Sequence, residues 1–539
     1  MKRADLGLLA LTAALLAVAI LPAGRWPTGD APHFLGVAAY LVNELTAGEL
    51  DRFAFHLSSL LAPHPPGGYL FAFPALLLGL DHAAALGTGI LALAVTWHGL
   101  RLLATDEGPP IGAWLLLLAT PMTWLAVEQL WWDLLAAACA AATLGHLHAS
   151  RGLAHRGHAL AFGAFMGLGF LTKYTFPFFV VVPTLLAGLR LPFQKAPGWT
   201  GLGLSLGAFG LVAGPWYGVK WQRVLAYASD SNDPGSTLVD ATSQPLTTAE
   251  LLRPEQLAYY PSVLLEALGW PALLLLLAAL PALRRPGPRL ALAGALGGVL
   301  ILSLLGQRQP RYLMPALPLL FLAVEAGLQP RLRGARALGA LLLLGVAGGG
   351  IWGAASTSWV TRTAPNTRLA DYGLASFEHW GSWPWPTEGF QPVSGDPELW
   401  QIDEGLRALA EVAGETPQTV GLLLEETPSA PGSGTYLWRA AMLGLPWDLA
   451  TVKPSGRGGQ PQVFIGPFAG EGWPPRDFRA LYVVDGPRRD GSAFAKRLGA
   501  TAGWSHALPD QRTGTVFTVP DTAWERSPGR ELIREDGPR

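Results

Sequence analysis

The sequence has little charge and almost no cysteine for its length. Only 14% of its 539 residues are charged, whereas an ordinary soluble domain carries about 25%. The net charge is −1, so no basic surface favours a nucleic-acid partner. Cys139 is the one cysteine, which excludes disulfides within the chain and cysteine metal clusters.

Apolar and aromatic residues are abundant instead. Half of the chain, 50%, is hydrophobic, and the mean hydropathy is +0.30. The 21 tryptophans are typical of a protein with many membrane–water boundaries, where amphipathic rings prefer to lie. The composition therefore indicates an integral membrane protein.

The apolar residues gather in stretches of the length that a membrane requires. A spanning helix needs about 17–25 of them, because its backbone polar groups must be satisfied within the segment. The first stretch follows Met1-Lys2-Arg3 and has no small-x-small cleavage site, so we interpret it as an uncleaved span rather than a signal peptide. The eleven expected spans are 6–23, 83–104, 111–127, 131–149, 158–172, 175–189, 199–216, 261–282, 289–305, 312–328 and 337–355.

Loop charge predicts the orientation in the cytoplasmic (inner) membrane. Cations concentrate in every second loop, which is the positive-inside pattern. The N-terminus is therefore expected in the cytoplasm, with the C-terminal part and the long loops 24–82 and 217–260 outside. Residues 68–80 are apolar but short, and a span there would put every later loop on the wrong side, so we expect an interfacial helix. The inner cations are Lys2, Arg3, Arg151, Arg156, Arg190, Lys195, Arg284, Arg285, Arg289, Arg331, Arg333 and Arg336.

The composition changes after residue 355. Residues 356–400 are rich in Trp, Pro, Gly and charge, and are interpreted as a linker. In 401–539, strand patterns at 419–424, 463–465, 480–484 and 515–519 alternate with helix patterns at 436–443 and 493–498. This alternation predicts a small α/β domain. The expected fold is thus an α-helical polytopic membrane protein over 1–355 with a C-terminal soluble α/β domain.

Several polar residues stand where the outer face is expected. Asp30 follows the first span, with His33 three residues later; such an aspartate can act as a base, a metal ligand or a helix cap. His64 precedes two prolines and can equally be part of a plain turn. Glu128 and Asp133 lie at the edges of apolar helices, where carboxylates are costly and usually face a polar cavity or a partner.

Three cations violate the charge bias at the same face. Lys173 ends the fifth expected span, and Arg308 and Arg311 precede the tenth, with Tyr312 beside them. Arginine and lysine gathered at this level suit a phosphate group. Ordinary contact with lipid headgroups is the alternative.

Taken together, these motifs resemble the GT-C superfamily of membrane glycosyltransferases. The nearest branch is the group of protein O-mannosyltransferases and aminoarabinose-transferase-like enzymes, and the similarity covers about residues 1–355. The motifs, in the family's order, are Asp30-x-x-His33-Phe34, His64-Pro65-Pro66, Pro121 with Asp133, Gly167-Leu168-x-x-Leu171-Thr172-Lys173, Pro215-Trp216-Tyr217 and Arg311-Tyr312-x-x-Pro315-x-x-Pro318.

The resemblance implies inverting transfer of a monosaccharide from a polyprenyl-phosphate carrier to an extracytoplasmic protein, lipid or glycan. Asp30 matches the family's first-loop catalytic acid, and Glu128 or Asp133 its second-loop acid. A divalent metal ion held by Asp30 and Glu128, or by Asp30 and Asp133, is one expectation, although Ala31 stands where many members have a second acidic residue. The expected substrate-binding residues are His33, His64, Lys173, Arg308, Arg311 and Tyr312.

Two other classes of function remain open at this point. A secondary transporter would use carboxylates near the membrane midplane and often shows internal repeats, which this sequence lacks. A non-catalytic membrane scaffold would use Asp30 only as a helix cap. The ionisable residues gather at one face, and this favours the glycosyltransferase.

Overall fold

The structure is a computed structural model of the whole chain, and its described residues fall into many segments. Described are residues 3–20, 31–59, 65–80, 83–104, 108–128, 130–189, 196–230, 260–261, 277, 280–304, 310–328, 402–413, 419–424, 440, 443, 445, 448–454, 461–464, 480–485, 501–507 and 513–518. The spans expected at 261–282 and 337–355 lie largely or wholly outside these segments, as do the linker and the helices expected at 436–443 and 493–498.

The chain divides into two compact units. The first comprises residues 1–23, 62–74 and 85–391, and the second comprises 24–61, 75–84 and 392–539. Each unit is described by itself below.

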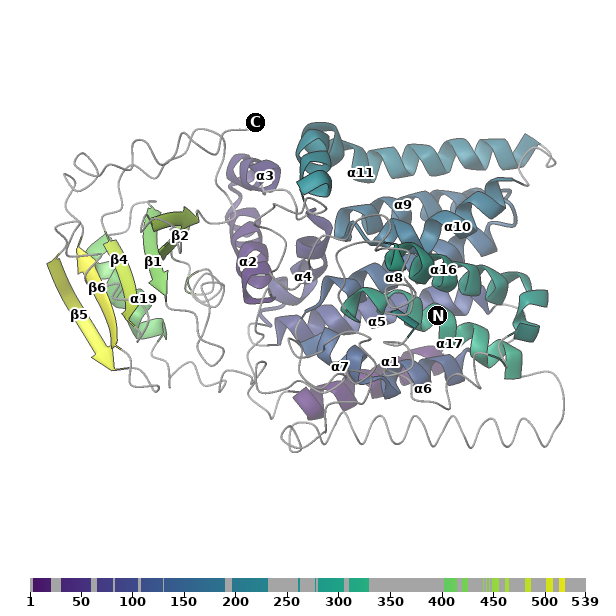
Figure 1. Cartoon of the computed structure of the whole chain (residues 1–539), viewed down its shortest axis with the longest axis horizontal. Helices are drawn as coiled ribbons and strands as arrows, with labels where there is room; N and C mark the ends of the chain where they lie inside the picture. The colour runs from purple at the N-terminus through teal and green to yellow at the C-terminus, as the bar shows by residue number, and fades with distance from the viewer. Residues whose placement is uncertain are drawn as a thin grey trace. The chain divides into compact units, whose positions relative to one another are not determined.

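The first unit is a bundle of helices (Figure 1). Helices are found at nine of the eleven expected spans within the described residues, and the short 3-10 helices η3 (Leu280–Arg284) and η4 (Pro310–Leu313) accompany them. The helices are α1 (Arg3–Ile20), α4 (Gly67–Leu77), α5 (Ala84–Leu103), α6 (Ile111–Ala119), α7 (Pro121–Glu128), α8 (Trp132–Ala149), α9 (Arg156–Thr172), α10 (Phe176–Gly188), α11 (Ala196–Asp230), α16 (Pro286–Ser303) and α17 (Ala316–Leu328).

Three helices in the described part are long and apolar enough to cross a membrane, over Ala84–Leu103, Gly198–Gln222 and Pro286–Ser303. Helix α11 shows the expected pattern of anchors. Its exposed Trp199 and Trp221 are separated by about 33 Å at 1.5 Å per residue, close to the roughly 30 Å of a bilayer's hydrocarbon core. Exposed Leu206 and Leu211 lie between them, as a lipid-facing surface requires.

Contacts between helix ends show which of them lie at the same end of the bundle. At one end, Asp133 at the start of α8 meets Lys173 after α9 and Arg311 before α17; we call this the site end. At the opposite end, Asp5 near the start of α1 pairs with Arg101 near the end of α5, at 3.4 Å. The end of α5 also lies beside the end of α8, since a Cβ on Gly287 would meet both the Leu103 carbonyl and the His148 ring. Helices α1, α5, α8, α9 and α17 therefore run in the directions that the loop-charge pattern predicts.

These directions also bear on the short apolar stretch at 68–80. Because α1 begins and α5 ends at the opposite end of the bundle, α1 ends and α5 begins at the site end. The chain between them therefore leaves and returns at the same end. This agrees with the expectation that residues 68–80 form a helix, α4, that does not add a crossing.

Two helices differ from the expected spans. The stretch 111–127 is not one helix, because Thr120 adopts an extended conformation (ψ 118°) before Pro121, which begins α7. A residue before proline is driven out of the helical region, and the proline itself starts a helix well. In α11, the helix continues from the expected end at residue 216 to Asp230, so the loop expected from 217 starts with helix.

Glycines allow the bundle's helices to approach closely. A Cβ on Gly99 of α5 would lie 2.2 Å from the Ala141 backbone of α8, and one on Gly145 would lie 2.6 Å from the Gly99 carbonyl. Likewise, a Cβ on Gly163 of α9 would meet the Ser205 carbonyl of α11 at 2.0 Å. Small residues at such crossings provide the van der Waals packing that joins helices in lipid.

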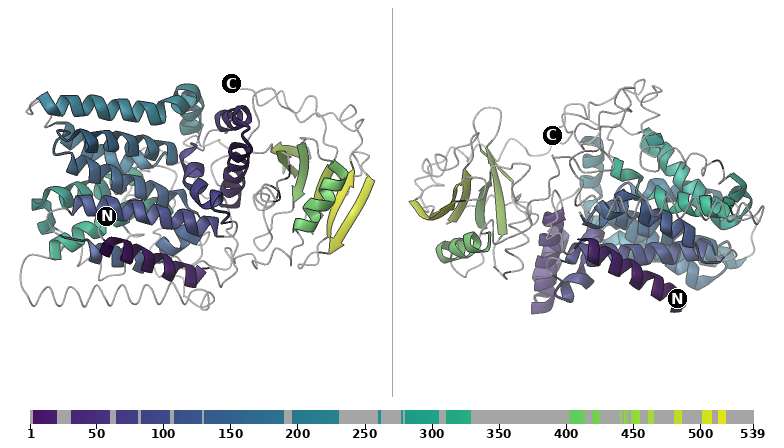
Figure 2. Two further views of the ribbon diagram at one scale, coloured as in Figure 1. Left: turned by 180° about the vertical axis from the view of Figure 1, so that it is seen from behind. Right: turned by 90° about the horizontal axis from the view of Figure 1, so that it is seen from below.

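The second unit contains a six-stranded mixed sheet in the order β3-β2-β1-β4-β6-β5. β1 pairs in parallel with β2 and β4, and the other pairs are antiparallel. Four strands match the expected ones; β2 and β5 were not expected. Helix α19 (Ile402–Ala413) packs beside β4 and β6 (Figure 2). The strands are β1 (Thr419–Leu424), β2 (Asp448–Pro454), β3 (Pro461–Phe464), β4 (Ala480–Asp485), β5 (Thr501–Ala507) and β6 (Thr513–Thr518).

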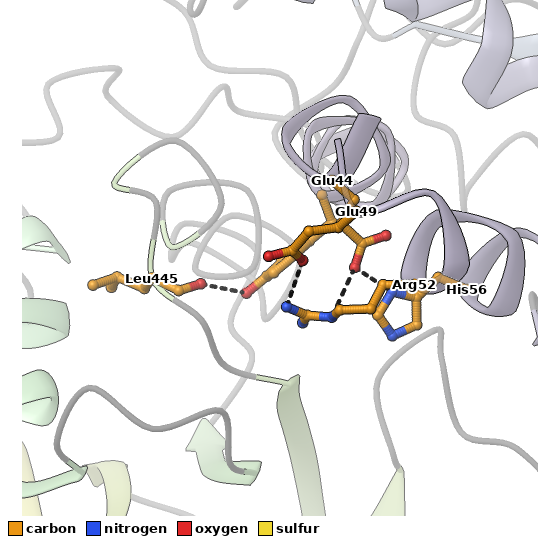
Figure 3. Close-up of polar contacts among 6 residues, drawn as sticks. Glu44, Glu49, Arg52, His56 and Leu445 are labelled. Carbon is orange, nitrogen blue, oxygen red and sulfur yellow. Dashed lines mark hydrogen bonds and ion pairs between the residues drawn. The ribbon is translucent and has the colours of Figure 1, made fainter. Parts of the chain in front are cut away.

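The same unit contains a helical hairpin from the first long loop, α2 (Ala31–Ala47) and α3 (Leu50–Ser59). Gly48, with φ +76°, makes the turn between them. Buried Glu44 of α2 accepts a hydrogen bond from His56 Nδ1 of α3 at 2.5 Å, and Arg52 lies 3.7 Å away (Figure 3). The Tyr40 hydroxyl donates to the Leu445 carbonyl at 3.5 Å, so the first loop and the C-terminal region belong to one unit.

The predicted orientation can be tested in a Cys139→Ala background. Ala154, between α8 and α9, and Glu49, between α2 and α3, are exposed. We expect a membrane-impermeant maleimide to label Glu49→Cys but not Ala154→Cys in intact spheroplasts, because the positive-inside rule places the Arg151 loop in the cytoplasm. The reverse labelling would contradict the orientation, and the Cys139→Ala protein alone gives the background.

Candidate active site

The candidate site is built around Asp133, in the first turn of α8. Its side chain is almost fully buried, with 1% exposed. An acidic residue here is favoured by the partial positive charge of a helix N-terminus. The N-cap residue, Trp131, makes no side-chain capping hydrogen bond. The carboxylate therefore lies where the backbone N–H groups of the first helical turn have no partner within the helix.

Lys173 supplies the closest positive charge. It follows α9 in an extended conformation (φ −158°, ψ 141°), and its backbone N–H donates to Gly169. Its ammonium donates to Asp133 Oδ2 at 2.5 Å and lies 4.7 Å from the centre of the Tyr312 ring. The lysine is thus held by a carboxylate and by the negative face of an aromatic ring.

Arg311 adds a second positive charge from η4, the short helix before α17. Its Nε lies 3.8 Å from the same Asp133 Oδ2. The Arg311 and Lys173 side chains keep 21% and 18% of their surface exposed, whereas Asp133 is buried. Two cations therefore contact one buried carboxylate, and both keep part of their surface exposed.

The other carboxylate oxygen of Asp133 has no assigned partner. Oδ1 is buried and, within the described residues, makes no hydrogen bond. An unsatisfied buried carboxylate oxygen costs free energy. Such an atom is a ready acceptor for a hydroxyl or ammonium group of a ligand.

A turn of small and cyclic residues closes the same end of the bundle. Residues 65–68 (Pro-Pro-Gly-Gly) are buried, and a Cβ on Gly67 would lie 2.6 Å from the Leu171 carbonyl. A Cβ on Gly68 would lie 2.3 Å from the Trp132 ring, which Tyr69 also contacts edge-on at 5.0 Å. The turn thus packs on the residues next to Asp133 and close to Lys173.

The structure brings together four of the predicted residues: Asp133, Lys173, Arg311 and Tyr312. Asp30, His64 and Arg308 lie outside the described residues. His33 is in the first turn of α2 and Glu128 is the last residue of α7, but their side chains are not described. The contributions of Gly67, Gly68 and Trp132 were not anticipated, although the Gly-Gly pair after two prolines was a signal of close packing.

The expected metal ion can be tested only against part of its proposed site. Within the described residues, no cluster of three or more potential ligands is found. Asp133, the alternative ligand to Glu128, does not fit a divalent cation well, because Lys173 and Arg311 already neutralise its Oδ2. Metal binding by Asp30 and Glu128 stays a prediction.

The first unit is thus a helical bundle with a carboxylate and two cations at one end. The chain has the fold of ArnT from Cupriavidus metallidurans. The crystal structure of that protein bound to undecaprenyl phosphate matches with a TM-score of 0.58 and 14% identity, covering 96% of this chain and 98% of that chain. Its apo structure matches with a TM-score of 0.57 and 15% identity, covering 95% and 97%.

The match agrees with the helical membrane fold that the motifs implied. It extends beyond residues 1–355, where the motifs lie, to almost the whole chain. No protein-family model and no curated protein sequence matches the chain.

The packing of the turn at 65–68 predicts a mutational effect. Gly68→Ala places a methyl group against the Trp132 ring, and such overpacking typically costs about 1–3 kcal/mol. We expect a lower thermal midpoint in detergent, whereas Gly203→Ala in α11, where a Cβ meets nothing within 4 Å, should leave it unchanged. Equal midpoints for both variants would show that the turn does not pack on Trp132.

Proposed function

We propose that the protein transfers a monosaccharide from a polyprenyl-phosphate carrier to an extracytoplasmic acceptor, with inversion at the sugar carbon. The observation that carries this proposal is the pair of cations on Asp133. In support, a protein with the same fold binds undecaprenyl phosphate. The site lies at the end of the bundle that the loop charges place outside the cytoplasm.

The charge of the site suits the leaving group of this reaction. As the sugar–oxygen bond breaks, negative charge develops on the oxygens of the lipid phosphate. Lys173 and Arg311 are already fixed by Asp133, so little reorganisation is needed to stabilise that charge. Arginine also offers two parallel hydrogen bonds to a phosphate. These interactions strengthen in the transition state, as catalysis requires.

Asp133 is assigned to holding the two cations. Its Oδ2 accepts the Lys173 hydrogen bond and lies 3.8 Å from Arg311 Nε, so this oxygen is already occupied by the two cations. Its Oδ1 is left to accept a hydrogen bond from the donor. This differs from the direct catalytic role expected for Asp133 as a second-loop acid.

The proton of the acceptor hydroxyl then passes to Asp30, the acid that matches the family's first-loop motif. The hydroxyl oxygen attacks the anomeric carbon, the bond from that carbon to the phosphate oxygen breaks, and polyprenyl phosphate leaves. General-base catalysis of this kind contributes about 10²–10⁴-fold.

A secondary transporter is the main rival. It would place its ionisable groups near the membrane midplane, between broken helices. Asp133 and its cations lie instead at helix ends: the first turn of α8, the residue after α9 and the 3-10 helix before α17. This placement favours chemistry at one face of the membrane.

The role of the cations predicts weaker donor binding together with a slower transfer step, because they contact the phosphate before and during bond cleavage. We expect Arg311→Ala to raise the donor KM on the order of 10- to 100-fold, because a hydrogen bond to a charged group contributes about 1.5–3 kcal/mol. Arg101→Ala is the matched control: Arg101 is 23% exposed and pairs with buried Asp5 at the opposite end of the bundle. An equal donor KM in both variants would show that Arg311 does not bind the donor phosphate.

The activity itself is tested with membranes that contain a radiolabelled polyprenyl-phosphate monosaccharide. We expect the wild type to transfer label and Asp30→Asn, at equal abundance, to lose at least about 10²-fold of the rate, because the substitution keeps a capping oxygen but removes the base. If the variant transfers as fast as the wild type, Asp30 is a helix cap. If neither the wild type nor the variant transfers label, the transporter and scaffold hypotheses are favoured.

A further inference from the structure

The turn between α7 and α8 has an unusual backbone conformation. Leu130 has φ +46°, in the left-handed region that favours glycine and is unfavourable for a residue with a Cβ. Among the described residues, Arg151 and Leu153 are the other non-glycine residues with positive φ, and both lie in the turn between α8 and α9. Leu130 therefore stands alone at the site end of the described bundle.

The hydrogen bonds show that this conformation ends helix α7. The backbone N–H of Trp131 donates to the Ala126 carbonyl at 2.9 Å, and that of Leu130 donates to Val127 at 3.4 Å. This pair of bonds is the Schellman motif, whose left-handed position is usually glycine. A glycine would fit the backbone without strain, so the leucine must contribute through its side chain.

The Leu130 side chain is buried, with 3% exposed. Its neighbours in the turn are also anchored: Val127 is fully buried and lies where a Cβ on Gly89 of α5 would meet it at 2.7 Å. The turn is thus fixed both by its hydrogen bonds and by a leucine that packs into the bundle. Strained residues held in this way are concentrated at functional sites.

The turn leads directly into the site. Trp131 is extended (φ −68°, ψ 123°), α8 starts at Trp132, and Asp133 is the second residue of that helix. On the other side, α7 ends at Glu128. Leu130 therefore determines where α8 begins and in which direction Asp133 leaves it, toward Lys173.

We infer that Leu130 is a positioning residue for the donor phosphate. Its buried side chain holds the left-handed turn, the turn holds Asp133, and Asp133 holds Lys173 and Arg311. This inference rests on the proposed function, because it needs the two cations to bind the donor. Leu130 acts through Asp133 and the two cations.

Leu153 provides a matched control for the experiment. It is also a leucine in the left-handed region, with φ +65°, and is 5% exposed, but it lies at the opposite end of the bundle. Leu130→Gly and Leu153→Gly both remove a buried leucine and relieve the same backbone strain. A purely structural role would make their effects alike.

We expect Leu130→Gly to raise the donor KM on the order of 10- to 100-fold per folded molecule, since a displacement of about 1 Å in a site can cost 10²-fold. The kcat at saturating donor should fall as well, because the same cations stabilise the leaving phosphate. Leu153→Gly should keep the wild-type donor KM. Leu130→Met, which restores a buried apolar side chain of similar volume, should return the KM to near the wild-type value.

The readout is donor KM and kcat of purified, monodisperse protein, normalised to folded molecules. If Leu130→Gly is not recovered folded, Leu130→Asn is measured instead, because asparagine tolerates the left-handed region but lacks the apolar anchor. Equal donor KM values for the Leu130 and Leu153 variants would overturn the inference. Absence of transfer by the wild type would contradict the proposed function, and the inference with it.

Discussion

The first unit of this protein is organised around one buried negative charge. A carboxylate taken out of water must be paired and hydrogen-bonded, or it changes its protonation state. Asp133 meets this requirement by drawing Lys173 from the end of α9 and Arg311 from the segment before α17. Three helix ends that are distant in the sequence are thereby held together.

The same constraint explains why small residues and strained backbone gather nearby. Next to Asp133, residues 65–68 pack closely on Trp132 and on the end of α9. Glycine at 67 and 68 allows this approach, because a Cβ at either position would clash. The direction of α8 must also be set, and the left-handed Leu130 does this. The two cations stay partly exposed, so they can bind a charged ligand while Asp133, which holds them, stays buried.

Much of this could be predicted from the sequence, because membrane helices follow from local composition. The apolar stretches and the alternation of loop charge placed α5, α8, α9 and α10 almost to the residue, and the off-pattern charges of Lys173 and Arg311 indicated a common site. The break at Thr120 was missed, although Pro121 was a signal for it. The continuation of α11 was missed because its last residues, such as Lys220, are too polar for a hydropathy pattern.

Other features depend on contacts that no local pattern contains. The pairing of Asp133 with Lys173 joins residues 40 positions apart, and no local sequence pattern predicts such an ion pair. The sequence around Leu130 does not indicate a left-handed backbone conformation at this position, since glycine is the usual signal. Strands β2 and β5 contain Lys453, Pro454 and Gly503, which weaken the strand pattern.

The central claim is that Lys173 and Arg311 form the binding site for a polyprenyl phosphate. It is tested most directly by equilibrium binding of undecaprenyl phosphate, without a sugar, to the purified protein in detergent. We predict that the wild type and Arg101→Met bind alike, and that Lys173→Met/Arg311→Met binds on the order of 100-fold more weakly or not at all. Equal binding by all three proteins, each shown to be folded, would contradict the account.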